Sequence, residues 1–182
     1  IYNHLELRKE FPDYQFQTNS DCEVILPLFQ KYGSNFLNKL NGIFAFSIYD
    51  KTTGNYFVAR DHMGICPLYY GRDKNGNFYV ASELKALSGI CNTIQVFLPG
   101  HYLNSPEGLN LQKWYEPTWA LYDAVKDNTT NLNLLRKSLE AAVHRQLMTD
   151  VPYGVLLSGG LDSSLIAAIT AKFSRNRIES GD

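Results

Sequence analysis

Residues 151–169 read VPYGVLLSGGLDSSLIAAI, and this stretch decides the fold of the C-terminal part of the chain. An apolar run, YGVLL at 153–157, enters a pair of glycines, and a helix-like segment, LDSSLIAAITAKF at 161–173, follows. This order of strand, glycine loop and helix is typical of the opening of a parallel α/β unit. The sequence therefore predicts a strand at 153–157, a loop at 158–160 and a helix at 161–173.

The loop carries groups that suit an anion. Glycines let the backbone approach a ligand closely, and a helix N-terminus adds partial positive charge. Ser158, Ser163 and Ser164 add hydroxyl donors, but no lysine follows the glycines, as the common nucleotide P-loop requires. Asp162 can supply the missing charge compensation by holding a Mg²⁺ ion that binds the phosphates. The simpler alternative is a tight turn in which a serine caps the helix and Asp162 favours the helix dipole.

The string SGGLDSS at 158–164 resembles the pyrophosphate loop of the N-type ATP pyrophosphatases. In that family a substrate carboxylate attacks the α-phosphate of ATP, and an acyl-adenylate forms. The resemblance implies that Asp162 meets Mg²⁺ and that Leu157 lies beside the nucleotide. It also implies that the pyrophosphate is bound by Ser158, Gly159, Gly160, Asp162, Ser163 and Ser164.

Upstream, short apolar segments separated by turn signals predict an α+β region in which consecutive strands pair antiparallel. The Asn75-Gly76 pair is a strong hairpin signal. The segment 42–50, apolar on both faces, is predicted to be a central, covered strand. Strands are predicted at 14–18, 42–50, 55–61, 67–73, 77–82, 101–105 and 109–116, and helices at 4–11, 21–33, 34–40 and 83–87.

Three segments in this region resemble class II glutamine amidotransferase domains: NGIFAFSIYD at 41–50, ARDHMGICPLYYG at 59–71 and ASELKAL at 81–87. These domains are N-terminal-nucleophile hydrolases. Within TNSDCEV at 18–24, Asp21 matches the family residue that binds the α-amino group of glutamine, and the simpler reading is a helix cap by Ser20 or Asp21. Joined to the pyrophosphate loop, the domain resembles the glutamine-hydrolysing asparagine synthetases.

That resemblance implies a fold in two parts. The first is an α+β N-terminal-nucleophile hydrolase sandwich, four-layer αββα and incomplete at its N-terminus. The second is the first strand-loop-helix of an α/β parallel-sheet ATP pyrophosphatase domain. The domains implied are 1–117 for the type 2 glutamine amidotransferase, 118–130 for a linker and 131–182 for a truncated pyrophosphatase domain. The last begins with a predicted amphipathic helix whose stripe is Leu132, Leu135, Leu139, Val143 and Leu147.

The activity implied is glutamine-dependent asparagine synthesis. Glutamine is hydrolysed in the first domain, and its ammonia attacks β-aspartyl-AMP formed from aspartate and ATP in the second. The products are asparagine, AMP, pyrophosphate and glutamate, with ATP and Mg²⁺ as the cofactors and a homodimer as the implied assembly.

The family's nucleophile is an N-terminal cysteine whose own α-amino group acts as base. The chain begins at Ile1, and Cys22, Cys66 and Cys91 have no free α-amine. We therefore expect no catalytic residue of this kind in the chain, and we expect the chain to be an inactive internal part of a longer protein.

Composition narrows the class of protein. A net charge of −1 and a pI near 6.5 give no basic surface for nucleic acid, and no apolar run reaches the roughly 18 residues of a membrane span. Three widely spaced cysteines suggest neither a zinc site nor a disulfide framework, which favours the cytoplasm. Arg60 and Asp61 are interpreted as a structural ion pair. Two alternatives stay open: a β-lactam synthetase-type enzyme, and a non-catalytic nucleotide-binding or interaction module.

Overall fold

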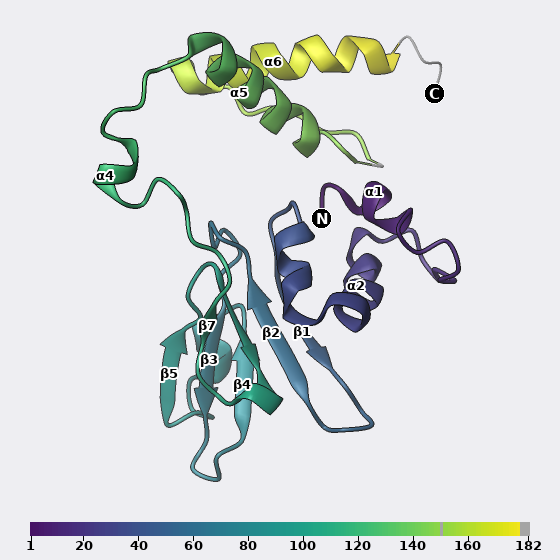
Figure 1. Ribbon diagram of the computed structural model, residues 1–182, viewed down its shortest axis with the longest axis vertical. Helices are drawn as coiled ribbons and strands as arrows, with labels where there is room; N and C mark the ends of the chain where they lie inside the picture. The colour runs from purple at the N-terminus through teal and green to yellow at the C-terminus, as the bar shows by residue number, and fades with distance from the viewer. Residues whose placement is uncertain (150, 179–182) are drawn as a thin grey trace. The chain divides into compact units, whose positions relative to one another are not determined.

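The computed structural model describes residues 1–149 and 151–178, with the side chains of 175–178 left aside (Figure 1). The chain divides into two compact units, Asn3–Leu121 with Ile1, and the part from Tyr122 onward. Each unit is described by itself.

The first unit contains two antiparallel sheets. One has the strand order β1-β2-β6-β7, and the other has the order β4-β3-β5. Every strand pair is antiparallel, as predicted, and the Asn75-Gly76 turn joins β3 to β4 with Gly76 at φ +85°. The strands are β1 (Ala45–Tyr49), β2 (Tyr56–Arg60), β3 (Tyr69–Arg72), β4 (Phe78–Ala81), β5 (Thr93–Val96), β6 (His101–Asn104) and β7 (Gln112–Lys113).

Short helices accompany the sheets. The predicted helix at 21–33 divides into a 3₁₀ turn and an α-helix, so that Pro27 falls in the first turn of the α-helix, where a missing N–H breaks no hydrogen bond. The helices of this unit are α1 (His4–Arg8), η1 (Asp21–Val24), α2 (Ile25–Tyr32), η2 (Gly33–Lys39), α3 (Leu84–Leu87) and η3 (Ser105–Glu107).

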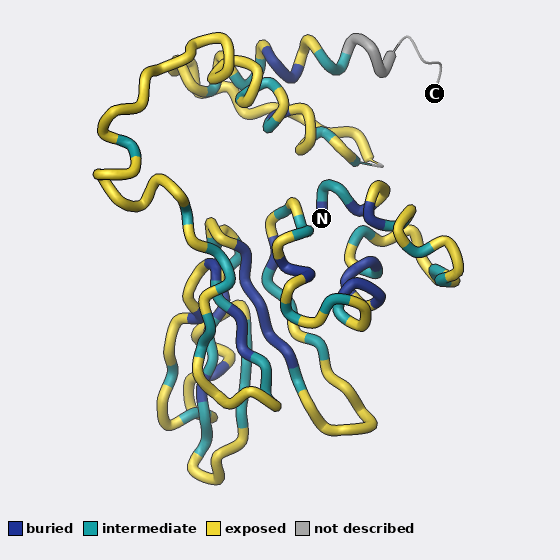
Figure 2. The backbone as a smooth tube through the Cα atoms, in the orientation of Figure 1, coloured by how far each residue is buried: buried dark blue, intermediate teal, exposed yellow. Residues whose placement is uncertain are grey.

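Strand β2 is buried along most of its length (Figure 2). It is covered on both faces, because its side chains alternate between two cores. Phe57 and Ala59 belong to a core shared with the helices, where Leu28 and Phe36 are fully buried. Val58 belongs to a second core made with residues of the other sheet and its flanks, Phe97 among them. The layers are therefore helices, four-stranded sheet and three-stranded sheet, with α3 against β3 and β4.

Three strand predictions are wrong. Segment 42–50 is not central: β1 is an edge strand, and Ser47 and Tyr49 are exposed. Residues 14–18 and 153–157 form no strand in the described structure, and the Leu156 side chain is 95% exposed. An apolar run indicates a strand only where a neighbouring strand can take its hydrogen bonds.

Arg60 and Asp61 are structural, but they do not form the predicted ion pair. Arg60 donates hydrogen bonds to the carbonyl oxygens of Cys66 (2.9 Å), Phe97 and Gly64 (both 2.6 Å). The buried Asp61 carboxylate accepts from the N–H groups of Phe44, Met63 and Gly64 at 2.8–3.0 Å. Both side chains are instead engaged by backbone groups, those of Gly64 among them.

The second unit contains α4 (Tyr122–Val125), α5 (Leu132–Gln146) and α6 (Leu161–Ile178). Helix α5 begins at its cap, Asn131, whose side chain accepts from the N–H of Leu134 at 3.0 Å. Helices α5 and α6 pack against each other. The rings of His144 and Phe173 stack with centroids 4.2 Å apart, and Lys172 forms an ion pair with Glu140 at 2.8 Å. None of the helices in the described ranges is long and apolar enough to cross a membrane.

Candidate functional site

The first candidate position is Asp21, the opening residue of η1. Ser20 is the cap of this turn, because its hydroxyl accepts from the N–H of Cys22 at 3.3 Å. The Asp21 side chain is 36% exposed and accepts a hydrogen bond from the amino group of Ile1. The capping prediction is therefore confirmed for Ser20, and the cap leaves the partly exposed Asp21 carboxylate unused.

The surroundings of Asp21 favour its ionised form. Burial acts to raise the pKa of Asp21, but the hydrogen bond and charge of the Ile1 amino group outweigh it, so this pKa is lowered. The neighbouring Cys22 shows the opposite effect: burial and the charge of Asp21 raise the pKa of its thiol. Cys22 thus stays a neutral thiol beside a carboxylate, which does not suit a nucleophile.

Sequence reasoning missed two charged residues near Asp21. Arg8 and Glu23 both hydrogen-bond to the backbone of the segment that leads into η1, residues 15–20. The available signal was Ser20-x-x-Glu23, the pattern of a capping box. Here Glu23 reaches beyond the cap residue, to the N–H groups of Gln17 and Thr18.

The second candidate site is the loop at 157–164 in the other unit. Gly159 has φ +83°, in the left-handed region that glycine allows, and Gly160 precedes the first turn of α6. The hydroxyls of Ser158 and Ser163 lie 2.9 Å apart. Ser163 and Ser164 donate to the carbonyl oxygen of Gly160 at 3.1 and 2.7 Å. The loop and helix predictions are confirmed here.

This loop brings together the serines and glycines named from the sequence at the N-terminus of an 18-residue helix. The first N–H groups of a helix lack partners within it and carry partial positive charge, so they suit a phosphate. Leu157 precedes the glycines and is 64% exposed. Asp21 belongs to the other unit, and the two sites are treated separately.

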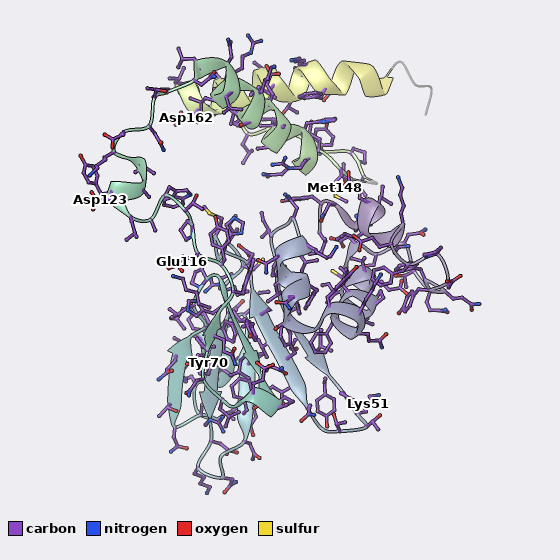
Figure 3. All side chains as sticks on the ribbon, in the orientation of Figure 1. Lys51, Tyr70, Glu116, Asp123, Met148 and Asp162 are labelled. Atoms are coloured by element: carbon purple, nitrogen blue, oxygen red, sulfur yellow. The ribbon has the colours of Figure 1, made fainter. Side chains whose placement is uncertain are left out.

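Asp162 fits a magnesium ion only as part of a metal–phosphate complex. It lies exposed at the start of α6 (Figure 3) and makes no hydrogen bond or ion pair with the described part of the chain. Among the described residues no three His, Cys, Asp or Glu side chains gather into a metal site. A single carboxylate matches Mg²⁺ bound by one or two protein oxygens together with substrate phosphates and water.

Two family models match the chain. The glutamine amidotransferase domain matches residues 1–103, and the asparagine synthase model matches residues 134–180. The first covers more than half of the chain and includes Asp21. The second includes the whole loop at 157–164.

Curated relatives match nearly the whole chain. Asparagine synthetase B [glutamine-hydrolyzing] of Escherichia coli (strain K12) is 56% identical over 180 residues, 98% of this chain and 32% of that protein. The asparagine synthetase of Sandersonia aurantiaca is 45% identical over 173 residues, 95% of this chain and 33% of that protein. The chain thus spans about a third of the length of these relatives.

Two solved structures share the fold of this chain. A structure titled as the allosteric regulatory enzyme of purine biosynthesis matches 92% of this chain and 40% of its own, with TM-score 0.54 and 25% identity. Glutamine phosphoribosylpyrophosphate amidotransferase of B. subtilis matches 92% of this chain and 41% of its own, with the same TM-score and identity. The similarity supports the N-terminal-nucleophile hydrolase fold for the antiparallel sheets.

Proposed function

Because this chain belongs to the glutamine amidotransferase domain family, we propose that the complete gene product is a glutamine-hydrolysing asparagine synthetase. The carrying observation is the match of 56% identity over 98% of the chain to a relative with that name. Both candidate sites lie inside this one match. The proposed reaction amidates aspartate through β-aspartyl-AMP with ammonia from glutamine, giving asparagine, AMP, pyrophosphate and glutamate.

Asp21 is proposed to bind the α-ammonium group of glutamine. An aspartate carboxylate, whose ordinary pKa is about 3.9, is ionised at neutral pH and attracts a cation. The remaining exposure of the Asp21 side chain, 36%, leaves access for a ligand.

The loop at 157–164 is proposed to bind the pyrophosphate part of ATP. The N–H groups at the start of α6 and the hydroxyls of Ser158, Ser163 and Ser164 are the donors. Asp162 would hold Mg²⁺, which neutralises phosphate charge and improves the leaving group. The glycines at 159 and 160 leave room for the ligand, since no neighbouring atom would crowd a Cβ at Gly159.

The separation of glutamine hydrolysis from aspartate activation has a physical reason. A free carboxylate is a poor electrophile, and adenylation gives it a leaving group. Ammonia that passes directly to the adenylate stays unprotonated and nucleophilic. We also propose a cytoplasmic location and a homodimer, as in the family that the sequence resembles.

The test measures asparagine and pyrophosphate formation by the complete gene product from aspartate, MgATP and either glutamine or ammonia. Asp21→Asn should raise the KM for glutamine about 10- to 100-fold, the value of one charged hydrogen bond, and leave ammonia-dependent synthesis intact. Asp162→Asn should reduce both reactions. The control is Asp123→Asn, which removes an exposed carboxylate paired with Lys126 in the same unit. Absence of aspartate-dependent pyrophosphate release would reject the proposal.

A further inference from the structure

The segment at 15–20 has no helix or strand of its own, yet it leads directly into Asp21. Two charged side chains hold it, one from each flanking element. Arg8 is the last residue of α1, and Glu23 lies in η1. The side chains are 17% and 11% exposed, so both are largely removed from solvent.

Glu23 binds the N–H side of the segment. Its carboxylate accepts from the N–H of Gln17 at 2.7 Å and from the N–H and hydroxyl of Thr18 at 2.8 and 2.7 Å. The Thr18 hydroxyl comes first among the groups that lower the pKa of Glu23, followed by the Gln17 N–H. The Glu23 carboxylate is therefore ionised at neutral pH, and both of its oxygens accept hydrogen bonds from the segment.

Arg8 binds the carbonyl side. Its Nη2 donates to the carbonyl oxygens of Thr18 and Ser20 at 2.8 and 2.9 Å, and its guanidinium lies 4.3 Å from the centre of the Phe16 ring. Arg8 Nη2 is also 3.9 Å from Glu23 Oε2. The two opposite charges thus hold the same stretch of backbone from its two polar sides.

The hydrogen bonds continue from Thr18 to the first turn of η1. The Thr18 hydroxyl accepts from the N–H of Ser20 at 3.2 Å, and the Ser20 hydroxyl accepts from the N–H of Cys22 at 3.3 Å. Asp21 lies between these last two residues. Its direction is therefore tied to Glu23 through Thr18 and Ser20.

We propose that Arg8, Thr18 and Glu23 are positioning residues that set the Asp21 carboxylate for the α-ammonium of the amino-acid substrate. The inference rests on the proposed function of Asp21. A binding carboxylate displaced by about an ångström loses much of its value, so these residues control the affinity for glutamine. They do not touch the reacting atoms.

The test uses the complete gene product and two reactions, glutamine hydrolysis and ammonia-dependent asparagine formation. Glu23→Gln keeps the shape but replaces an acceptor oxygen with a donor group. Thr18→Val removes the hydroxyl, and Thr18→Ser retains it. Glu23→Gln and Thr18→Val should each raise the KM for glutamine about 10-fold or more, change kcat for hydrolysis less than about threefold and leave the ammonia reaction unchanged. Thr18→Ser should restore the wild-type KM.

The matched control is Glu10→Gln. Glu10 also accepts hydrogen bonds through a carboxylate, from Tyr32 at 2.9 Å and Lys39 at 3.1 Å, but lies outside the 15–20 segment. The KM of the Glu10→Gln variant for glutamine should equal that of the wild type.

Three results would overturn the inference. One is an unchanged KM in both Glu23→Gln and Thr18→Val while Asp21→Asn raises it. Another is an equal loss in both reactions, which marks a merely structural role. A third is failure of Thr18→Ser to restore the KM. If Asp21→Asn itself leaves the KM unchanged, the proposed function of Asp21 fails instead. Should Glu23→Gln not fold, the Thr18 pair decides.

Discussion

The two units are both rich in leucine and other apolar residues, but only the first builds an extensive core. In the first unit Phe36, Phe57 and Phe97 have relative exposures of 0–1%. In the second, Val143 and Ile169 are the buried apolar side chains among the described residues, while Leu156 and Leu161 are 95% and 83% exposed. Apolar content is therefore a poor measure of burial, and the partners that cover each face decide it.

Strand β2 and helix α5 show the difference most clearly. Strand β2 has helices on one face and a second sheet on the other. Within the described part of the chain helix α5 packs mainly against one helix, α6, and a groove of about 470 Å³ remains between them. The groove is lined mainly by Leu132, Leu135, Leu139, Leu165, Ala168 and Ile169. An element with one partner leaves part of its apolar face in contact with solvent.

The largest expected effect on the free energy of unfolding comes from Phe57→Ala, in the core of the first unit. Phe57 is 1% exposed, and its ring lies 4.9 Å from that of Phe29 and 5.4 Å from that of Tyr102. The cavity should lower the free energy of unfolding by about 3–5 kcal/mol, measured by urea titration with near-ultraviolet circular dichroism. Leu156→Ala, at an exposed position, should change it by less than about 0.5 kcal/mol in the 182-residue chain. Similar costs at both positions would contradict the contrast.

A smaller effect should come from Gly71→Ala. A Cβ on Gly71 would lie 2.5 Å from the carbonyl oxygen of Thr93 and 2.9 Å from Cys91 Sγ, so the β3–β5 pair would have to separate. The expected cost is about 1–3 kcal/mol in the same urea titration. Gly154→Ala is the matched control in the second unit, because nothing lies within 4 Å of its Cβ. An equal loss at Gly154 would show that the second unit is packed more tightly than described.

The two units also show which parts of the fold the sequence could predict. The hairpin at Asn75-Gly76 and the helix after SGG follow from local chemistry, because glycine permits the turn and the serines and apolar spacing favour the helix. The central position of β2 could not be predicted, since it depends on β6 from a distant part of the chain. Segment 42–50 is more apolar but stays at the edge.

In the candidate sites too, residues of local motifs could be predicted, whereas contacts that depend on the folded chain could not. Asp21 and the loop residues were found because they belong to short, continuous motifs, and their roles remain proposals. Glu23 was missed because its carboxylate binds the backbone at Gln17 and Thr18, a contact that appears only after the segment bends back. The strand predicted at 153–157 is not observed, because an apolar run does not indicate whether a neighbouring strand is present to pair with it.

The smallest expected effect is a change in the hydrogen-exchange rate of helix α6 at acid pH. Hydrogen bonds from Lys172 and then Arg136 lower the pKa of Glu140 in the folded state. A lowered folded pKa means that this stabilisation is present above the ordinary pKa of glutamate, about 4.3, and is lost as the pH falls through the folded value. Hydrogen exchange of α6 should therefore accelerate below about pH 4 more in the wild type than in Glu140→Gln.

The matched substitution in the first unit is Glu10→Gln, where Tyr32 and then Lys39 lower the carboxyl pKa. Exchange in the β2 core should hardly respond to it, since that core is packed on both faces. A larger acid response of β2 than of α6 would reverse the comparison.

The strand order β1-β2-β6-β7 also has a consequence for synthesis on the ribosome. Strand β2 ends at Arg60, but its neighbour β6 begins at His101, after the whole β4-β3-β5 sheet has been translated. During that interval the nascent chain carries an apolar strand with an open edge, which is a template for pairing with other chains. While residues 61–100 are being translated, the open edge of β2 is thus exposed to pairing with other chains, and a chaperone that covers it would prevent aggregation.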